Sequence, residues 1–290
     1  MKFLSYIKCL RVMQFYKNAT IFAPLFFSEN ITNIPLFISV FLVFLAFSFA
    51  SSIVYIVNDI ADKEKDRLHP IKSKRPIASG KVSTLEALAL ACLLGVVMLF
   101  LLARLHLSAS IIIFAYIGLN LLYSFRLKHI PVFDVFLVGF LFVLRILAGG
   151  IPVNIKITPW IIFAIFFIAL LLAVGKRKSE LVHIENKRKV LDSYTEGILD
   201  AMLIVSVTAC IVFYALYCIL GAHSELVLYS LFFVVLALLR YLYLNLKKHD
   251  VESIEHLVLR DKILFFSLFF WFLYMLFAFY QDTGLVFVFS

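Results

Sequence analysis

One stretch of the sequence, residues 57–80, combines carboxylates and basic side chains directly after a long apolar segment. Its 24 residues include three aspartates, one glutamate, four lysines and two arginines. Asp59, Asp62 and Asp66 are spaced i, i+3 and i+7, so a continuous helix would place them on one face about one turn apart. Neighbouring carboxylates repel one another unless a cation lies between them. Mg²⁺ is the usual one, because it takes oxygen ligands and commonly bridges to substrate phosphates. The stretch therefore predicts a magnesium site that holds a diphosphate.

Basic residues follow the aspartates and suit the phosphate oxygens that a metal leaves bare. Lys74 and Arg75 are two of them. The alternative is a charged helix end with local ion pairs, such as Asp59 with Lys63 at i, i+4. Because the carboxylates end a membrane-length segment, where ionisable groups are costly and usually functional, the metal–diphosphate interpretation is favoured.

The composition excludes a soluble domain. The chain has 290 residues, 63% of them hydrophobic, and a mean hydropathy of +1.02. Charged residues make up 16%, against about 25% in ordinary proteins, and they cluster between apolar segments of membrane-spanning length. The fold class is therefore an all-α polytopic membrane protein with about nine transmembrane helices. The expected spans are 14–28, 35–57, 84–103, 107–124, 131–150, 158–175, 197–220, 224–246 and 263–281, of which the first is the weakest because Pro24 interrupts it.

The net charge of +9 is distributed as in a membrane protein and does not indicate nucleic-acid binding. Of the 27 lysines and arginines, 23 lie in the N-terminal segment or after even-numbered spans. The positive-inside rule places those segments in the cytoplasm and the C-terminus outside. The predicted metal site then lies on the cytoplasmic face of the cell's inner (plasma) membrane.

The N-terminal residues 1–13 are basic and amphipathic, as in a helix lying on lipid headgroups. Lys17 and Asn18 follow at the predicted inner surface. Two interpretations remain open: these two residues belong to the surface segment, or they point into the site.

Polar residues also lie within or directly after later spans. Arg145, inside an apolar segment, requires an acidic partner or a bound anion. Lys176, Arg177 and Glu180 follow the sixth span as the first charged block follows the second, which suggests two helical halves meeting around one central cavity open to the cytoplasm. The remaining candidate substrate contacts are Arg67, Tyr123 and Lys128. Asp134 lies just inside the fifth expected span, where a solvated acid is harder to accommodate.

The sequence NDIADKEKD at residues 58–66 resembles the NDxxDxxxD signature of the UbiA-type membrane prenyltransferase superfamily. The flanking sequences RVMQFYKN, HPIKSKRPIASG, YSFRLKHIPVFD, VLRILAGG, GKRKSEL and RKVLDSYT resemble its decaprenyl-phosphate phosphoribosyltransferase branch. The resemblance covers residues 11–261 and implies a single nine-helix transmembrane domain over residues 1–290. It also implies Mg²⁺ bound through Asn58, Asp59, Asp62 and Asp66. Branches that transfer prenyl groups carry a second aspartate-rich motif, where this chain has GKRKSEL with the single acid Glu180.

The branch implies transfer of 5-phosphoribose from phosphoribosyl diphosphate (PRPP) to a polyprenyl phosphate in the membrane. In that case Asp59, Asp62 and Asp66 serve catalysis through the metal, and the basic residues hold phosphate oxygens. Two rivals remain. One is a prenyltransferase that joins a prenyl diphosphate to an aromatic acceptor, and the other is a membrane transporter whose inner carboxylates bind cations.

Overall fold

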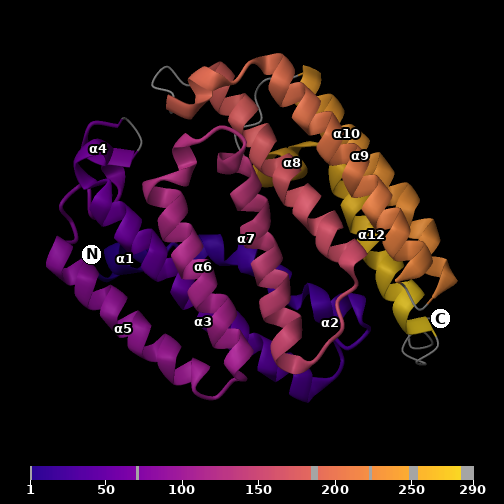
Figure 1. Cartoon of the computed structure of the whole chain (residues 1–290), viewed down its shortest axis with the longest axis horizontal. Coiled ribbons are helices and arrows are strands. Elements are labelled where there is room, and N and C mark those ends of the chain that lie inside the picture. The colour runs from indigo at the N-terminus through magenta and orange to yellow at the C-terminus, as the bar shows by residue number, and fades with distance from the viewer. Residues whose placement is uncertain (1, 70–71, 184–188, 222–223, 248–253, 282–290) are drawn as a thin grey trace. The chain divides into compact units, whose positions relative to one another are not determined.

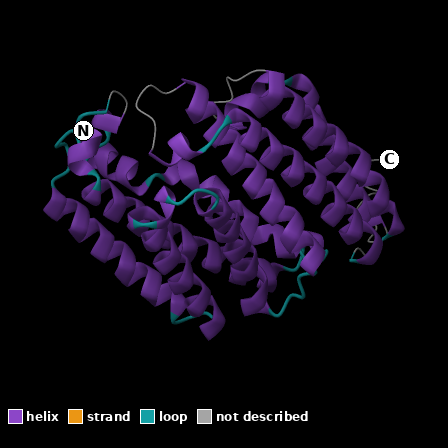
Figure 2. Ribbon diagram, turned by 45° about the horizontal axis from the view of Figure 1, so that its top comes forward, coloured by secondary structure: helices purple, strands orange, loops and turns teal. Residues whose placement is uncertain are grey.

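The protein was analysed as a computed structural model, which describes residues 2–69, 72–183, 189–221, 224–247 and 254–281. Helices and short connections make up these described residues, without a strand (Figures 1 and 2). The all-α prediction is confirmed. The α-helices are α1 (Lys2–Leu10), α2 (Ala23–Phe27), α3 (Ile34–Ala61), α4 (Lys63–Arg67), α5 (Thr84–Leu102), α6 (Leu107–Phe125), α7 (Phe133–Gly150), α8 (Pro159–His183), α9 (Glu196–Leu220), α10 (Leu231–Lys247), α11 (Ile254–Arg260) and α12 (Lys262–Tyr280). The 3₁₀ helices are η1 (Val12–Phe22), η2 (Lys72–Lys74), η3 (Leu127–His129), η4 (Ile151–Val153), η5 (Lys189–Ser193) and η6 (Glu225–Ser230).

Eight helices in the described part of the chain are long and apolar enough to cross a membrane. The chain is thus a multi-pass membrane protein, and the predicted count of nine is approximate. The difference lies in the first expected span, 14–28, which consists of η1 followed by α2. Pro24 lies in the first turn of α2, where its missing N–H costs nothing, whereas inside one longer helix it would remove a hydrogen bond.

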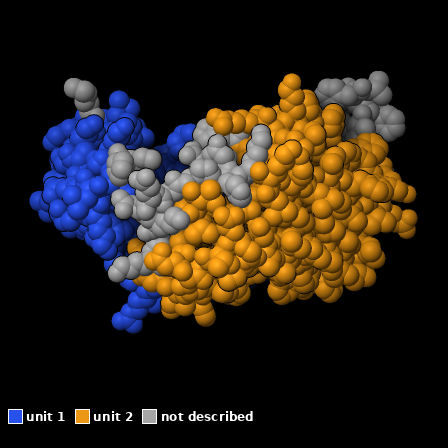
Figure 3. All heavy atoms as spheres, turned by 90° about the horizontal axis from the view of Figure 1, so that it is seen from above, with its two compact units in different colours: residues 1–126, 144–156 blue, residues 127–143, 157–290 orange. Residues whose placement is uncertain are grey.

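The chain divides into two compact units (Figure 3). Unit 1 comprises residues 1–126 and 144–156, and unit 2 comprises residues 127–143 and 157–290. Each unit is described by itself below. The single-domain organisation and the cavity between two halves stay predictions.

In unit 1, helix α3 packs against α1, α5, α6 and η1. Small residues on α3 allow this close approach: Ser52 Oγ donates to the carbonyl of Leu10 at 2.8 Å, and Ser51 shares a hydrogen bond with Tyr116 at 3.0 Å. Ser83 and Glu86 form a capping box that starts α5. Residues 103–106 join α5 to α6 as a tight hairpin.

A glycine brings α7 against η1 within unit 1. A Cβ atom on Gly149 would meet the backbone of Ile21, with the carbonyl oxygen 1.8 Å away. Backbone cannot move aside as a side chain can, so only glycine permits this approach. The contact fixes the end of α7 beside the 3₁₀ helix that carries Lys17 and Asn18.

In unit 2, helix α9 packs against α8, and α10 packs against α9 and α12. Leu171, Val174, Leu199 and Leu203 are buried in its core. Gly175 again permits close approach, because a Cβ there would lie 2.3 Å from the hydroxyl of Tyr241 on α10. The second charged block thus begins at a tightly packed point of α8.

Candidate functional site

The signature aspartates lie on two helices rather than one. Helix α3 ends at Ala61, and α4 begins at Lys63. Asp62 forms the junction with φ of −93° and ψ of 8°, outside regular helical geometry. The single continuous helix expected from the spacing is therefore wrong, and Asp66 reaches Asp59 from a separate short helix.

Arg75 brings Asp59 and Asp66 together. Its Nη1 atom donates to Asp59 Oδ1 at 3.0 Å and to Asp66 Oδ2 at 2.6 Å. Both carboxylates are buried, whereas Arg75 is partly exposed. Because buried carboxylates require a counter-charge, this arginine supplies part of what the sequence assigned to a metal.

A second arginine, Arg11, contacts the same oxygen atom. Arg11 Nη2 donates to Asp59 Oδ1 at 2.5 Å, and its guanidinium lies over the Tyr55 ring, 4.7 Å from the centroid. Arg11 joins α1 to η1 with φ of 50° and ψ of 44°. The left-handed conformation costs a non-glycine residue about 1–2 kcal/mol. No local spacing indicates this contact, because the sequence shows Arg11 only among the cytoplasmic positive charges and as the first residue of RVMQFYKN.

The oxygen-rich donor set fits Mg²⁺. Asn58 precedes Asp59, and its buried side-chain oxygen Oδ1 has no hydrogen-bond partner. An orphaned amide oxygen and two buried carboxylates are the kind of ligands that a hard cation prefers. Among the described residues, no three acidic, His or Cys side chains converge on one metal position. Mg²⁺ does not require three, because it is commonly bound by one or two carboxylates together with substrate phosphates and water.

The pair between Asp59 and Lys63 that the alternative interpretation offered does not form, although another local ion pair does. Lys63 donates to Thr84 Oγ1 at 3.2 Å rather than to Asp59. Arg67 is exposed, pairs with Glu64 at 3.0 Å, and also donates to the Ala78 carbonyl. Lys74 is exposed in η2.

Lys17 and Asn18 lie on η1 with different surroundings. Lys17 is partly exposed, with its ammonium 5.7 Å from the centre of the Tyr16 ring. Asn18 is buried, donates to Ser48 Oγ at 3.0 Å and accepts from Arg145 Nε at 2.9 Å. Asn18 is therefore part of the interior of unit 1.

Arg145 is held inside unit 1 among polar and aromatic groups. In addition to its bond to Asn18, it donates through Nη2 to the Tyr116 hydroxyl at 3.1 Å and lies over the rings of Tyr116 and Phe47. Neutral oxygens and aromatic faces thus stabilise the buried guanidinium. Its contact with substrate stays a prediction.

In unit 2, the second charged block forms a buried ion cluster. Arg177 Nε donates to Asp134 Oδ2 at 2.7 Å, and its Nη1 donates to Glu180 Oε2 at 2.8 Å. Asp134 and Arg177 are both buried. Glu180 therefore pairs with Arg177 at i, i+3, and the guanidinium is engaged by a carboxylate on each side.

Tyr194 completes this cluster. Its hydroxyl donates to Asp134 Oδ1 at 2.7 Å and accepts from the backbone N–H of Val132 at 2.6 Å. Burial, followed by the hydrogen bond to Asp134, raises the pKa of Tyr194 to about 12. Val132 has φ of 69°, which a β-branched residue rarely adopts. The protonated hydroxyl thus holds a strained turn at the start of α7.

The same chain matches a family model over most of its length. Residues 19–273 match the UbiA prenyltransferase family. This chain belongs to that family. The decaprenyl-phosphate phosphoribosyltransferase of Corynebacterium glutamicum is 37% identical over 219 residues, which cover 73% of this chain and 66% of that protein. The enzyme of the same name from Mycobacterium tuberculosis is 31% identical over 269 residues, which cover 89% of this chain and 88% of that one.

Solved structures confirm the UbiA fold. A UbiA homologue from Archaeoglobus fulgidus bound to DMAPP and Mg²⁺ superposes with a TM-score of 0.73 at 19% identity, covering 95% of this chain and 98% of that one. At this identity the likeness establishes the fold alone.

The remaining predicted site residues of this UbiA-family chain are at least partly exposed. Lys176 is exposed on α8, next to the buried Arg177. Lys128 is partly exposed in η3, and Tyr123 is partly exposed on α6. Their substrate contacts stay predictions.

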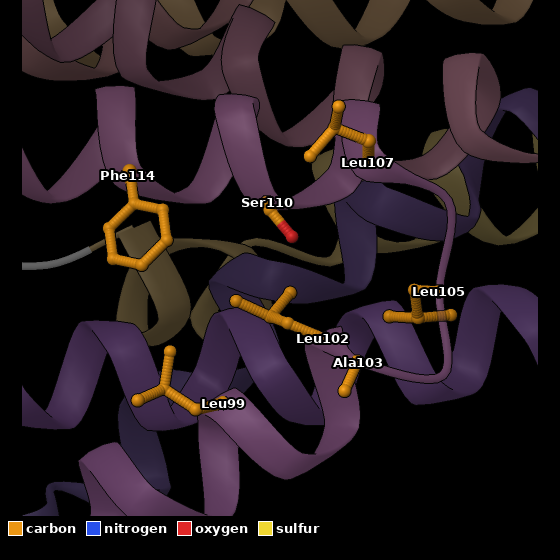
Figure 4. Close-up of a pocket in the computed structure, with 7 residues that line it drawn as sticks. All are labelled: Leu99, Leu102, Ala103, Leu105, Leu107, Ser110 and Phe114. Carbon is orange, nitrogen blue, oxygen red and sulfur yellow. The ribbon is translucent and has the colours of Figure 1, made fainter.

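The pocket in Figure 4 does not belong to this chemistry. It has a volume of about 370 Å³ and lies at the α5–α6 hairpin of unit 1. Thr84, which contacts Lys63, is at the other end of α5. The side chains that line the pocket are apolar except for Ser110, and none is charged. They are Leu99, Leu102, Ala103, Leu105, Leu107, Ser110 and Phe114.

Proposed function

We propose that this UbiA-family chain transfers 5-phosphoribose from PRPP to a polyprenyl phosphate and releases diphosphate. The arrangement of Asp59 and Asp66 around Arg75 carries the assignment of the donor site, because it joins buried oxygen ligands to a cationic donor group. The names of the curated relatives support the choice of phosphoribosyl transfer within the family.

Asn58, Asp59 and Asp66 are the residues that would hold Mg²⁺, with Asp62 at the helix junction between them. The metal would neutralise the donor diphosphate and favour its departure. Arg75 hydrogen-bonds phosphate oxygens in this scheme, and Lys74, Arg67 and Lys17 add positive charge at the exposed side of unit 1. The chain thereby orients the diphosphate as the leaving group.

The reaction forms one bond and breaks one bond at the anomeric carbon of ribose. A phosphate oxygen of the lipid attacks this carbon, while the bond to the diphosphate oxygen breaks and the diphosphate leaves with the electron pair. The transition state carries oxocarbenium character, as in other glycosyl transfers. A lipid phosphate is already anionic at neutral pH, so no general base is required. Catalysis then depends on positioning and charge neutralisation.

In unit 2 we assign phosphate contact to Lys176 and Lys128 and a positioning role to Arg177. Lys176 is exposed and Lys128 is partly exposed, whereas Arg177 is buried between Asp134 and Glu180. Burial keeps Arg177 from contact with a further anion, whereas Arg75, which also pairs with two carboxylates, is partly exposed. By the distribution of basic residues, we place the site on the cytoplasmic side of the plasma membrane.

The test uses purified protein in detergent with Mg²⁺, radiolabelled PRPP and polyprenyl phosphate. Label is expected to move into the organic phase with the wild type and not with Asp59→Ala. Glu196→Gln, which alters an exposed carboxylate at the start of α9, is the matched control and retains activity. Turnover of a prenyl diphosphate with an aromatic acid, without transfer from PRPP, would instead establish a prenyltransferase.

A further inference from the structure

Arg11 binds Asp59 in unit 1 at a position for which a metal ion or a diphosphate would compete. Asp59 Oδ1 accepts from Arg11 at 2.5 Å and from Arg75 at 3.0 Å. A carboxylate oxygen has two lone pairs in its plane, and these two donors fill them. A metal ion can therefore bind this oxygen only as one of the arginines withdraws, and a metal ion on Oδ2, the other oxygen of the same carboxylate, would lie close to both guanidinium groups.

The backbone and the ring of Tyr55 set the position of this guanidinium. The carbonyl of Leu10 accepts from Ser52 on α3, and Cys9 is buried. Lys2 and Tyr6 both donate to Glu86, which ties the start of α1 to α5. Helix α1 is thus anchored at its start and at its end, so the chain places Arg11 beside Asp59.

The charges of this group balance without any ligand. Asp59 and Asp66 contribute two negative charges, and Arg11 and Arg75 contribute two positive charges. A divalent cation would add positive charge among these groups, and a diphosphate would add negative charge. The arginines are partly exposed whereas the carboxylates are buried, so the arginine side chains can change conformation and leave the carboxylates.

We propose that Arg11 is an exchange cation of the donor site. It neutralises Asp59 while no metal is bound, and it moves to a diphosphate oxygen when a divalent cation takes its place. The exchange rests on the proposed donor site and adds a residue to it. Arg11 therefore opposes the binding of a metal alone and favours the binding of a metal together with diphosphate.

The test is the affinity for Mn²⁺, measured by electron paramagnetic resonance, with and without inorganic diphosphate. In Arg11→Gln, Mn²⁺ alone is expected to bind about threefold to tenfold more tightly, because one competing cation is lost. With diphosphate present, Mn²⁺ is expected to bind about tenfold more weakly, because one phosphate contact is lost. Arg11→Lys keeps the charge and should restore part of both affinities.

Lys8→Gln is the matched control, because it removes one positive charge from an exposed position on the same helix α1. It should leave both Mn²⁺ affinities unchanged. A loss of both affinities in Arg11→Gln, or no change in either, would overturn the exchange. Transfer from PRPP by the same wild-type preparation separates the two proposals. If the wild type transfers label from PRPP but the two Mn²⁺ affinities of Arg11→Gln do not shift in opposite directions, only the exchange role of Arg11 is refuted. If the affinities shift in opposite directions but no label is transferred, only the assigned reaction is refuted.

Discussion

The two units each hold an arginine between two carboxylates, but the arginine is partly exposed in unit 1 and buried in unit 2. In unit 1 the side chains of Asp59 and Asp66 are 5% exposed, whereas Arg11 and Arg75 are 26% and 31% exposed. In unit 2 the side chain of Arg177 is itself only 5% exposed, and that of Asp134 is fully buried. The cations of unit 1 can be reached from outside, and the cation of unit 2 cannot.

This difference in exposure suits the arginines of unit 1 to exchanging partners and the arginine of unit 2 to stabilising the fold. A partly exposed guanidinium can leave a carboxylate and be solvated, so a ligand can replace it at moderate cost. A buried guanidinium has no such alternative, and removing it leaves buried negative charge. Substituting these charged residues should therefore reduce mainly activity in unit 1 and mainly stability in unit 2.

The largest effect is expected from Asp59→Asn. The substitution retains the size of the side chain but removes the charge that a metal–diphosphate complex requires. We expect kcat/KM for transfer from PRPP to fall by about a thousandfold, as for other groups that stabilise charge in the transition state. The check is a steady-state assay together with the midpoint of thermal unfolding in detergent. A variant with nearly full activity would remove Asp59 from the site.

Arg177→Met should act mainly on stability. It leaves Asp134 and Glu180 without their shared cation, and breaking a buried ion pair costs about 3–5 kcal/mol. The free energy of unfolding in detergent checks this value. Adding Asp134→Leu should recover part of the loss, because it removes the most deeply buried charge. A stable Arg177→Met protein that has lost transfer would instead make Arg177 a substrate ligand.

The sequence predicted those parts of the fold that depend on local patterns. The lengths of the apolar segments located the eight membrane-length helices, including α5 from Thr84 to Leu102. The break at Asp62 was missed because polar helix ends have no strong periodicity. Aspartates at i, i+3 and i+7 have the spacing of one continuous helix. Pro24 identified the first expected span as weak, but the sequence did not predict that this span consists of two short helices.

The candidate site could be predicted only in part, since its contacts join distant positions. Asp59 and Asp66 were identified from the signature, and Arg75 was identified as a nearby cation. Arg11 lies 48 positions before Asp59, and no local spacing links the two. Tyr194 likewise lies 60 positions after Asp134. Such partners are set by helix packing, which a single sequence does not encode in any short pattern.

Tyr194→Phe tests the buried cluster of unit 2 with a smaller change. Losing the hydroxyl leaves Asp134 Oδ1 and the Val132 N–H without this partner, a loss of about 1–3 kcal/mol for a buried group. The pKa of about 12 lies above the ordinary value, so the contribution is fully present below about pH 10 and fades only as pH rises toward 12. The unfolding difference from wild type should therefore be equal at about pH 6 and about pH 9. A difference that changes between them would mean that another group titrates with the cluster.

The smallest effect is expected from Asp261→Asn, which tests a third arginine–carboxylate pair at the edge of unit 2. Arg240 donates to both oxygens of Asp261, at 3.1 and 2.7 Å, and Asp261 also caps α12 through the N–H of Leu264. Asparagine caps a helix about as well as aspartate, so the substitution isolates the ion pair, worth about 0.5–1 kcal/mol at a partly exposed site. The hydrogen bond from Arg240 holds the pKa of Asp261 below its ordinary value. A depressed pKa means that the stabilisation is present above the unfolded value of about 3.9 and is lost as pH falls through the folded value. The difference in unfolding midpoint between wild type and variant should thus be constant from about pH 7 to about pH 5 and shrink below about pH 4. If the difference persists in acid, the substitution acts through something other than the charge of the carboxylate, and the ion pair with Arg240 contributes no stability.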